Sequence, residues 1–133
     1  MLETVNVSVF VACDKVIEEN INHKKTIVGI FRNFGFPELP ARNAAPWFLF
    51  VQMSGLPAGK HDITVNVVHD ATQGVVFAAG FDIPEDHAEN VDLIIPAQST
   101  EFGNEGDHVA TLNIDGTQVK CFALRVVLKR TPG

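Results

Sequence analysis

The chain has 133 residues and carries sixteen acidic side chains against ten Lys and Arg, a formal net charge of −6 at pH 7. This length predicts a single domain, residues 1–133, with one substantial core. The charge excludes nucleic acid as an expected partner, because phosphate binding depends on clustered cations. The apolar runs are too short to span a bilayer and no basic region precedes the first, so we predict a cytoplasmic protein without a membrane partner.

The first half of the chain alternates apolar and polar residues, as strands do, and shows no sustained helical stripe. The run TVNVSVFVA (4–12) predicts a half-buried strand that ends near Ala12. The runs KKTIVGIFRNF (24–34) and PWFLFVQM (46–53) are apolar on both faces. These two strands therefore need cover on both sides.

The second half contains further strands separated by turn residues. HDATQG (69–74) links two alternating runs, and NVDLIIPA (90–97) gives another strand. The pair Asp115–Gly116 predicts a two-residue type I′ turn in the last hairpin. The whole pattern predicts an all-β fold, an antiparallel β-sandwich of about eight strands that is immunoglobulin-like in the broad sense.

Two cysteines, Cys13 and Cys121, are expected to remain reduced and to serve as small buried hydrophobes. Asp14 follows Cys13 and can form a turn with its own backbone. A neighbouring carboxylate raises the pKa of a thiol, whereas a nucleophilic cysteine needs a lowered one. We therefore interpret Cys13 as a structural strand end.

The histidines and the acidic run 82–92 are the candidate metal ligands. His61 and His69 are in phase with the inward residues of their strand, and so is His108 in its own, which predicts that they reach the core at strand ends. Histidines at least eight residues apart can converge only through the fold. The acidic run lacks the spacing of a calcium-binding helix–loop–helix motif. We predict no metal and no cofactor, with calcium binding at 82–92 as the alternative.

Catalytic signatures are absent from the sequence, which contains no G-x-S-x-G, no P-loop and no H-E-x-x-H. We therefore predict no catalytic residue and a protein that is not an enzyme. The alternative is a small hydrolase that uses a loop histidine.

The two strands that are apolar on both faces suggest a contact with a second copy of the chain, most simply a two-fold dimer. The alternative is that the loop GFPELPARNAAP (35–46) covers the outer face. The residues predicted for the interface are Ile27, Ile30, Phe31, Trp47, Phe48 and Phe50.

The pattern ACDKVIEENINHKKTIVGIF, followed by an aromatic strand and PAGKHDITVNVV, resembles a family of small uncharacterised bacterial proteins. The matching residues are Cys13, Asp14, Lys24, Gly29, Ile30 and Phe31. The turn NINHKK departs from the commoner form, which has a glycine before the lysine. The resemblance implies a β-sandwich of bacterial cytoplasmic origin and no particular activity.

The function expected from these observations is that of a non-catalytic interaction or scaffold module that self-associates. A second hypothesis is a module that binds a small molecule or carbohydrate with loops at one end. The sequence contains one Trp and no Tyr, so the aromatic platforms that usually stack on sugars are scarce.

Overall fold

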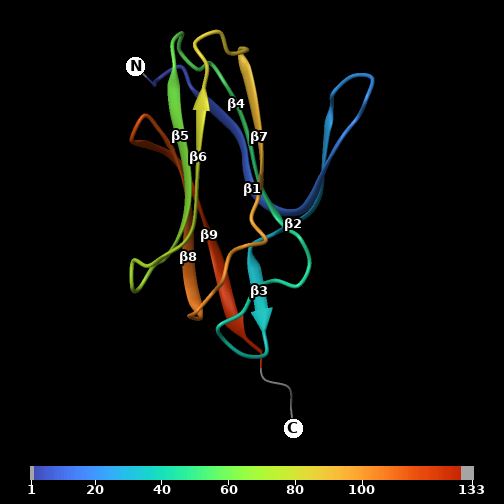
Figure 1. The fold of residues 1–133 in the computed structure, drawn as a ribbon, viewed down its shortest axis with the longest axis vertical. Coiled ribbons are helices and arrows are strands. Elements are labelled where there is room, and N and C mark those ends of the chain that lie inside the picture. Colours follow the sequence, from blue (N-terminus) through green and yellow to red (C-terminus); the bar gives the residue numbers. More distant parts are fainter. Residues whose placement is uncertain (1, 130–133) are drawn as a thin grey trace.

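A computed structural model describes residues 2–129 and shows an all-β sandwich of two packed sheets (Figure 1). No helix in this range is long and apolar enough to cross a membrane. The nine strands of the described residues are β1 (Asn6–Glu18), β2 (Lys25–Phe31), β3 (Asn33–Phe36), β4 (Phe48–Ser54), β5 (His61–His69), β6 (Val75–Ile83), β7 (Asn90–Pro96), β8 (Gly106–Ile114) and β9 (Thr117–Leu128).

The strand order is β2-β1-β4-β7 in one sheet, called sheet A here, and β3-β9-β8-β5-β6 in the other, sheet B. Neighbours pair antiparallel except β3, which pairs parallel to β9. The predicted sandwich is confirmed, with one strand more than expected. The extra strand is β3, which joins sheet B because Phe34 and Phe36 alternate into the core.

The core lies between the sheets and contains the inward phase of each central strand. On β5 this phase is Ile63, Val65 and Val67, all fully buried, as the alternation predicts. At one end of the sandwich the core is aromatic: the Trp47 ring centroid lies 5.0 Å from that of Phe34 and 6.4 Å from that of Phe102. This cluster fixes the start of β4 against β3.

The prediction that the first strand ends near Ala12 is wrong, because β1 continues to Glu18. Its second half pairs with β2, from Ala12 opposite Phe31 to Glu18 opposite Lys25. Asp14 makes no turn there; its carboxylate lies over Gly29, where an added Cβ would overlap it. Gly29 has a φ of +70°, which glycine adopts without strain. The turn lies farther on, between Glu18 and Lys25.

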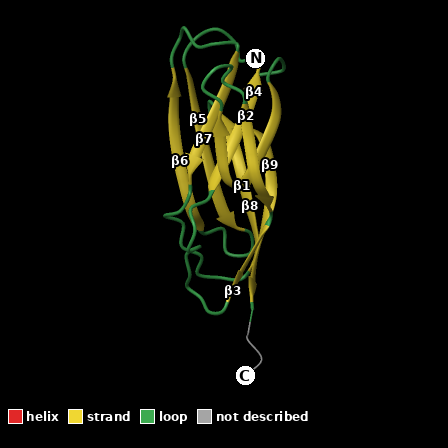
Figure 2. Cartoon of the chain, turned by 90° about the vertical axis from the view of Figure 1, so that its right-hand side faces the viewer, coloured by secondary structure: helices red, strands yellow, loops and turns green. Residues whose placement is uncertain are grey.

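The β1–β2 hairpin extends out of sheet A and runs back alongside β4 and β7 (Figures 1 and 2). Lys25 connects its tip to the sheet, since its Nζ lies 3.5 Å from Asp92 Oδ2 of β7 and 3.4 Å from Glu18 Oε1. The loop that follows β3 takes another course: Ala41 forms a bridge with Phe102, and Leu39 packs on the core. That loop closes one end of the sandwich, and the hairpin faces the outer side of sheet A.

Two smaller predictions have opposite outcomes. Asp115 and Gly116 have φ values of 51° and 81°, which confirms the expected turn between β8 and β9. The expectation that Cys121 is buried is wrong, because it is exposed on the outer side of sheet B. Phe122, Leu124 and Val126 take the inward phase of β9, so Cys121 faces solvent.

Candidate interaction surface

The part of the predicted interface that lies on β4 or just before it is largely buried within the single chain. Trp47 is fully buried in the aromatic cluster. Phe50 faces away from the core, between Val11 and Ile94 on the neighbouring strands, yet is only 1% exposed. Phe48 is half-buried on the same face. This strand therefore offers little surface to a second molecule.

The part that lies on β2 is more accessible. Ile30 is 58% exposed and Ile27 is half-buried. Phe31 points the other way, with its ring centroid 4.9 Å from that of Phe34 and 5.8 Å from that of Trp47. The strand is thus anchored through Phe31 and presents Ile30 to solvent. In sheet A, β2 pairs only with β1, so its second edge is open.

The hairpin that carries β2 presents two further isoleucines. Ile21 at its tip is 96% exposed, and Ile17 on β1 is 44% exposed. The turn itself is held by polar contacts: Glu19 N donates to Lys24 O at 2.9 Å, and His23, with a φ of 57°, lies 3.2 Å from Glu18. The tip is therefore ordered by hydrogen bonds and holds Ile21 in solvent.

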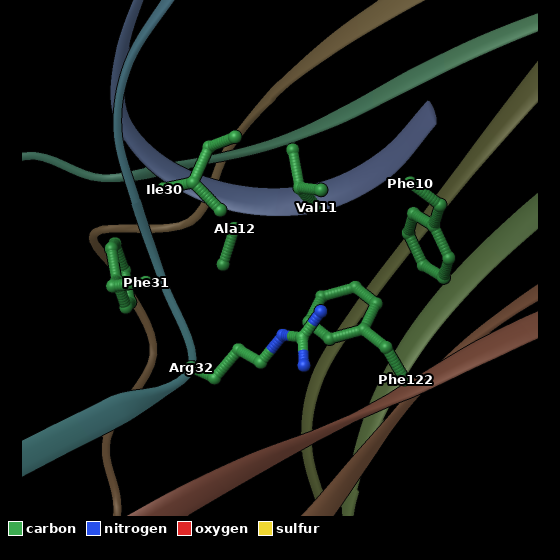
Figure 3. A pocket seen from close by; sticks show the side chains of 7 residues that line it. All are labelled: Phe10, Val11, Ala12, Ile30, Phe31, Arg32 and Phe122. Atoms are coloured by element: carbon green, nitrogen blue, oxygen red, sulfur yellow. The ribbon is translucent and has the colours of Figure 1, made fainter. Parts of the chain in front are cut away.

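A small depression adjoins Ile30 where the two sheets meet (Figure 3). Its walls include Phe10, Ile30 and Phe31 of sheet A and Phe122 of β9, and the Arg32 guanidinium extends toward Phe122. Its volume of about 30 Å³ is too small for a metabolite. It could receive one side chain of a protein partner.

Cys13 lies on the outer side of sheet A and is fully buried. Burial raises the pKa of its thiol, and the charge of Asp14 raises it further. Both effects keep the sulfur protonated at neutral pH. Cys13 therefore lacks the thiolate character of a nucleophile, as the sequence predicts, although it lies within a strand and not at its end.

The fold brings His61 and His87 together at one end of the sandwich, with ring centroids 5.7 Å apart. His61 Nδ1 lies 2.7 Å from Asp115 Oδ2, and its Nε2 lies 2.7 Å from the Pro57 carbonyl oxygen. The hydrogen bond to Asp115 raises the pKa of His61, and the bond to Pro57 adds to the effect. Both nitrogens face acceptors, so His61 ties the loop before β5 to the turn between β8 and β9 and has no free base for catalysis.

His69 and His108 form a second pair at the opposite end of strands β5 and β8. They are cross-strand partners with ring centroids 4.9 Å apart, and both are buried, as predicted. Burial lowers the pKa of His108, and its ring packs edge-on against Phe102 at 5.3 Å. His69 bonds Thr72 Oγ1 at 2.8 Å and Glu105 O at 3.1 Å. This pair belongs to the core.

The acidic run 82–92 is spread over two strands and their connection. Asp82 faces Asp62 across β5 and β6, while Asp92 contacts Lys25. A hydrogen bond with Asp82 raises the pKa of Asp62, and the negative charge of Asp82 raises it further. Within residues 2–129, no group of three His, Cys, Asp or Glu side chains is arranged to hold a metal ion.

A model described as a family of unknown function, DUF6941, matches residues 8–127. The chain belongs to this family. No curated protein matches this DUF6941 member.

Among solved structures, a β-glucosidase from Listeria innocua gives a TM-score of 0.50 at 10% identity over 92% of this chain, which spans only 16% of the glucosidase. An alkylpurine DNA glycosylase, AlkC, from Pseudomonas fluorescens gives 0.47 at 11% identity, covering 93% and 30% of the two chains. An immunoglobulin-like protein from Pseudomonas aeruginosa gives 0.47 at 11% identity, covering 92% and 95%. The glucosidase likeness shows a shared fold and nothing about the activity of the DUF6941 chain.

Sequence reasoning missed two exposed residues of this surface, Ile17 and Ile21. It placed one turn at Asp14 and another at Asn20–His23, whereas β1 continues through Asp14 to Glu18. The sequence did contain a signal for this strand. Lys15, Ile17 and Glu19 share one phase of a period-two pattern, with Val16 in the other phase, as expected of a strand with one exposed face.

Proposed function

We propose that this protein is a non-catalytic interaction module that self-associates as a two-fold dimer through β2. The observation that carries the proposal is an open edge strand with an exposed Ile30, on a hairpin that also exposes Ile17 and Ile21. A two-stranded hairpin has little stability of its own in water. Contact with a second copy would bury these side chains and support the hairpin.

The other edges of the two sheets are less suited to pairing. β7 ends in Pro96, which has no N–H to donate, and it carries Asp92. β6 carries Asp82, already opposed by Asp62 on its neighbour. β3 has only four residues. A proline or a charge on an edge strand discourages pairing between molecules, and β2 has neither between Thr26 and Phe31.

Electrostatics also favours the hairpin as the contact. The whole chain carries a net charge of −6, so two copies repel each other over most of their surfaces. Between residues 14 and 31 the formal charges cancel, because three acidic side chains oppose three lysines. The six residues are Asp14, Glu18, Glu19, Lys15, Lys24 and Lys25.

Antiparallel pairing of β2 with the same strand of a second copy would join the two sheets A into one continuous sheet. A two-fold axis that passes between the two β2 strands satisfies this arrangement with the same surface on each chain. Ile30 would then lie beside the junction, close to the depression of Figure 3. The open N–H and C=O groups of β2 would become hydrogen-bonded.

The test is light scattering coupled to size exclusion over about a hundredfold range of concentration. The wild type is expected at dimer mass, and Ile30→Asn is expected to raise the dimer dissociation constant by about tenfold or more. Val75→Asn is the matched control, because Val75 is 62% exposed on the edge strand of the other sheet. It should leave the dimer intact.

Hydrogen exchange separates edge pairing from other contacts. In the wild-type dimer, the backbone amides on the free edge of β2 should exchange more slowly than the same amides in Ile30→Asn. The exchange rates of the β6 amides should be the same in both proteins. A wild type that stays monomeric throughout the range would overturn the proposal. So would a dimer that tolerates Ile30→Asn and dissociates in Val75→Asn.

A further inference from the structure

A polar groove lies on the outer side of sheet A, away from the open edge of β2. It has a volume of about 460 Å³, within the range of small-molecule sites. The polar side chains that line it are Asn6, Ser8, Gln52, Ser54, Asn90 and Asp92. They come from β1, β4 and β7, three adjacent strands of one sheet.

The strand register places these side chains in two rows. Ser54 pairs with Asn6 on one side and with Asn90 on the other, and Gln52 pairs with Asp92 in the next row. Rows two residues apart are separated by about 7 Å, and three strands span about 10 Å. The groove floor is therefore a flat polar grid with the dimensions of one sugar ring and its hydroxyl groups.

Several of these groups have unused hydrogen-bonding capacity. Ser8 Oγ lies 3.1 Å from Gln52 Oε1 and 3.2 Å from the Gln52 carbonyl oxygen, so its hydroxyl proton is engaged, whereas the Gln52 amide nitrogen donates to no residue of the range 2–129. The side chains of Asn6, Ser54 and Asn90 form no hydrogen bond with any other residue of the range 2–129. Amides and hydroxyls that both donate and accept suit a ligand that does the same.

The charges of the groove indicate a neutral ligand. Among the described residues, Asp92 is the only ionisable side chain that lines it, and the Lys25 ammonium lies 3.5 Å from its carboxylate. Lys25 is itself largely buried, with 15% of its side chain exposed, so the Asp92 carboxylate already has a cationic partner. An anion would meet Asp92, and a cation would compete with Lys25. No aromatic side chain of residues 2–129 lines the groove, so hydrogen bonds and not ring stacking would hold a ligand there.

We propose that this groove binds a neutral, hydroxyl-rich ligand of the mono- or disaccharide class. Asn6, Ser54 and Asn90 would bond its hydroxyl groups in one row, and Gln52 and Asp92 would do so in the other. This site lies on the face of a sheet, not on the end loops of the sandwich, and is separate from the self-association proposed above.

The test is an NMR titration of isotope-labelled protein with glucose, maltose and cellobiose at millimolar concentrations. At least one of these sugars is expected to shift the backbone amides around Asn6, Gln52 and Asn90. Asn90→Ala should weaken binding about tenfold, because it removes a donor and an acceptor from the ligand. Asn66→Ala is the matched control, since Asn66 is a polar residue on the outer side of sheet B, and it should leave affinity unchanged.

Two comparisons test the ligand class and the independence of the site. Glucuronate should bind more weakly than glucose, because its carboxylate would meet Asp92. Ile30→Asn should bind sugar as the wild type does, whatever its oligomeric state. The proposal is overturned if none of the three sugars shifts these amides, if glucuronate binds as well as glucose, or if Asn90→Ala binds normally. Binding of a short Gly-Ser peptide in place of the sugars would also overturn it.

Discussion

Strands β4 and β2 flank β1 in the same sheet, yet their outer faces have opposite environments. On β4 the outward Phe50 is 1% exposed and the inward Leu49 is fully buried. On β2 the inward Phe31 joins the aromatic cluster, whereas the outward Ile30 is 58% exposed. The two strands are apolar on both faces to a similar degree, so composition alone does not decide which outer face is covered.

Position in the sheet accounts for the difference. β4 is an interior strand with β1 and β7 on its sides, and the hairpin runs back along its outer face. β2 is the outermost strand and forms part of that cover, so no other segment of the described chain pairs with its free edge. In this sheet the outer apolar face of the interior strand β4 is covered within the chain, whereas Ile30 on the outermost strand β2 stays exposed.

The largest loss of stability is expected from Trp47→Ala, at the residue just before β4. The indole is fully buried between Phe31, Phe34 and Phe102. Removing it should lower the free energy of unfolding by about 3–5 kcal/mol, measured by urea denaturation followed by circular dichroism.

The control for this variant is Trp47→Phe, which retains an aromatic ring. The Trp47 Nε1 has no hydrogen-bond partner among residues 2–129, so this exchange removes no such bond. Trp47→Phe should lower the free energy of unfolding by less than half as much as Trp47→Ala does. A small loss in Trp47→Ala, or an equal loss in both variants, would show that the aromatic cluster does not anchor β4.

A smaller effect is expected from Phe50→Ala on the outer face of β4. The ring is as buried as a core residue, but the hairpin beside it can settle into the space, so the expected loss is about 2–3 kcal/mol. Phe48→Ala, on the same face and half-buried, should cost less. Fluorescence of the single Trp can follow both unfolding curves. If Phe50→Ala and Phe48→Ala both leave the free energy of unfolding almost unchanged, the outer face of β4 is not covered and does not differ from that of β2.

The alternation of apolar residues was sufficient to predict the sandwich, the inward phase of β5 and the Asp115–Gly116 turn, because each depends on local spacing. It also placed His61, His69 and His108 at strand ends. It could not predict that His61 would meet His87, or that β3 would pair with β9, because these contacts depend on how distant segments meet in the fold.

Alternation does not place a side chain correctly where the strand pairing is irregular. Val75 is in phase with Phe77 and Phe81, which suggests an inward position, but a register shift between Val67 and Val68 leaves it 62% exposed. A shift of one residue moves a side chain to the other face. The length of β1 also depends on a feature that alternation does not show. Gly29 has no side chain and adopts a positive φ, so β2 can pair with β1 on both sides of Asp14.

The smallest effect is expected at Gly29, which determines how the hairpin leaves the sheet. Gly29→Ala would place a methyl group on the Asp14 carboxylate and would force a non-glycine residue to a φ of +70°. The left-handed conformation alone costs about 1–2 kcal/mol, and the carboxylate can rotate away. The free energy of unfolding should fall by about that amount, with faster hydrogen exchange in β2 than in β4.

Gly80→Ala is the matched control, because Gly80 lies within a strand, has no positive φ, and has room for a methyl group, 3.9 Å from the Ile63 carbonyl oxygen. It should be neutral or stabilise the fold by a few tenths of a kcal/mol, since alanine has less freedom in the unfolded chain. If both glycines behave alike, Gly29 does not control the path of the hairpin. If only Gly29→Ala loosens β2 and leaves β4 unchanged, the hairpin is a separately stabilised cover, held by its bend and by Lys25.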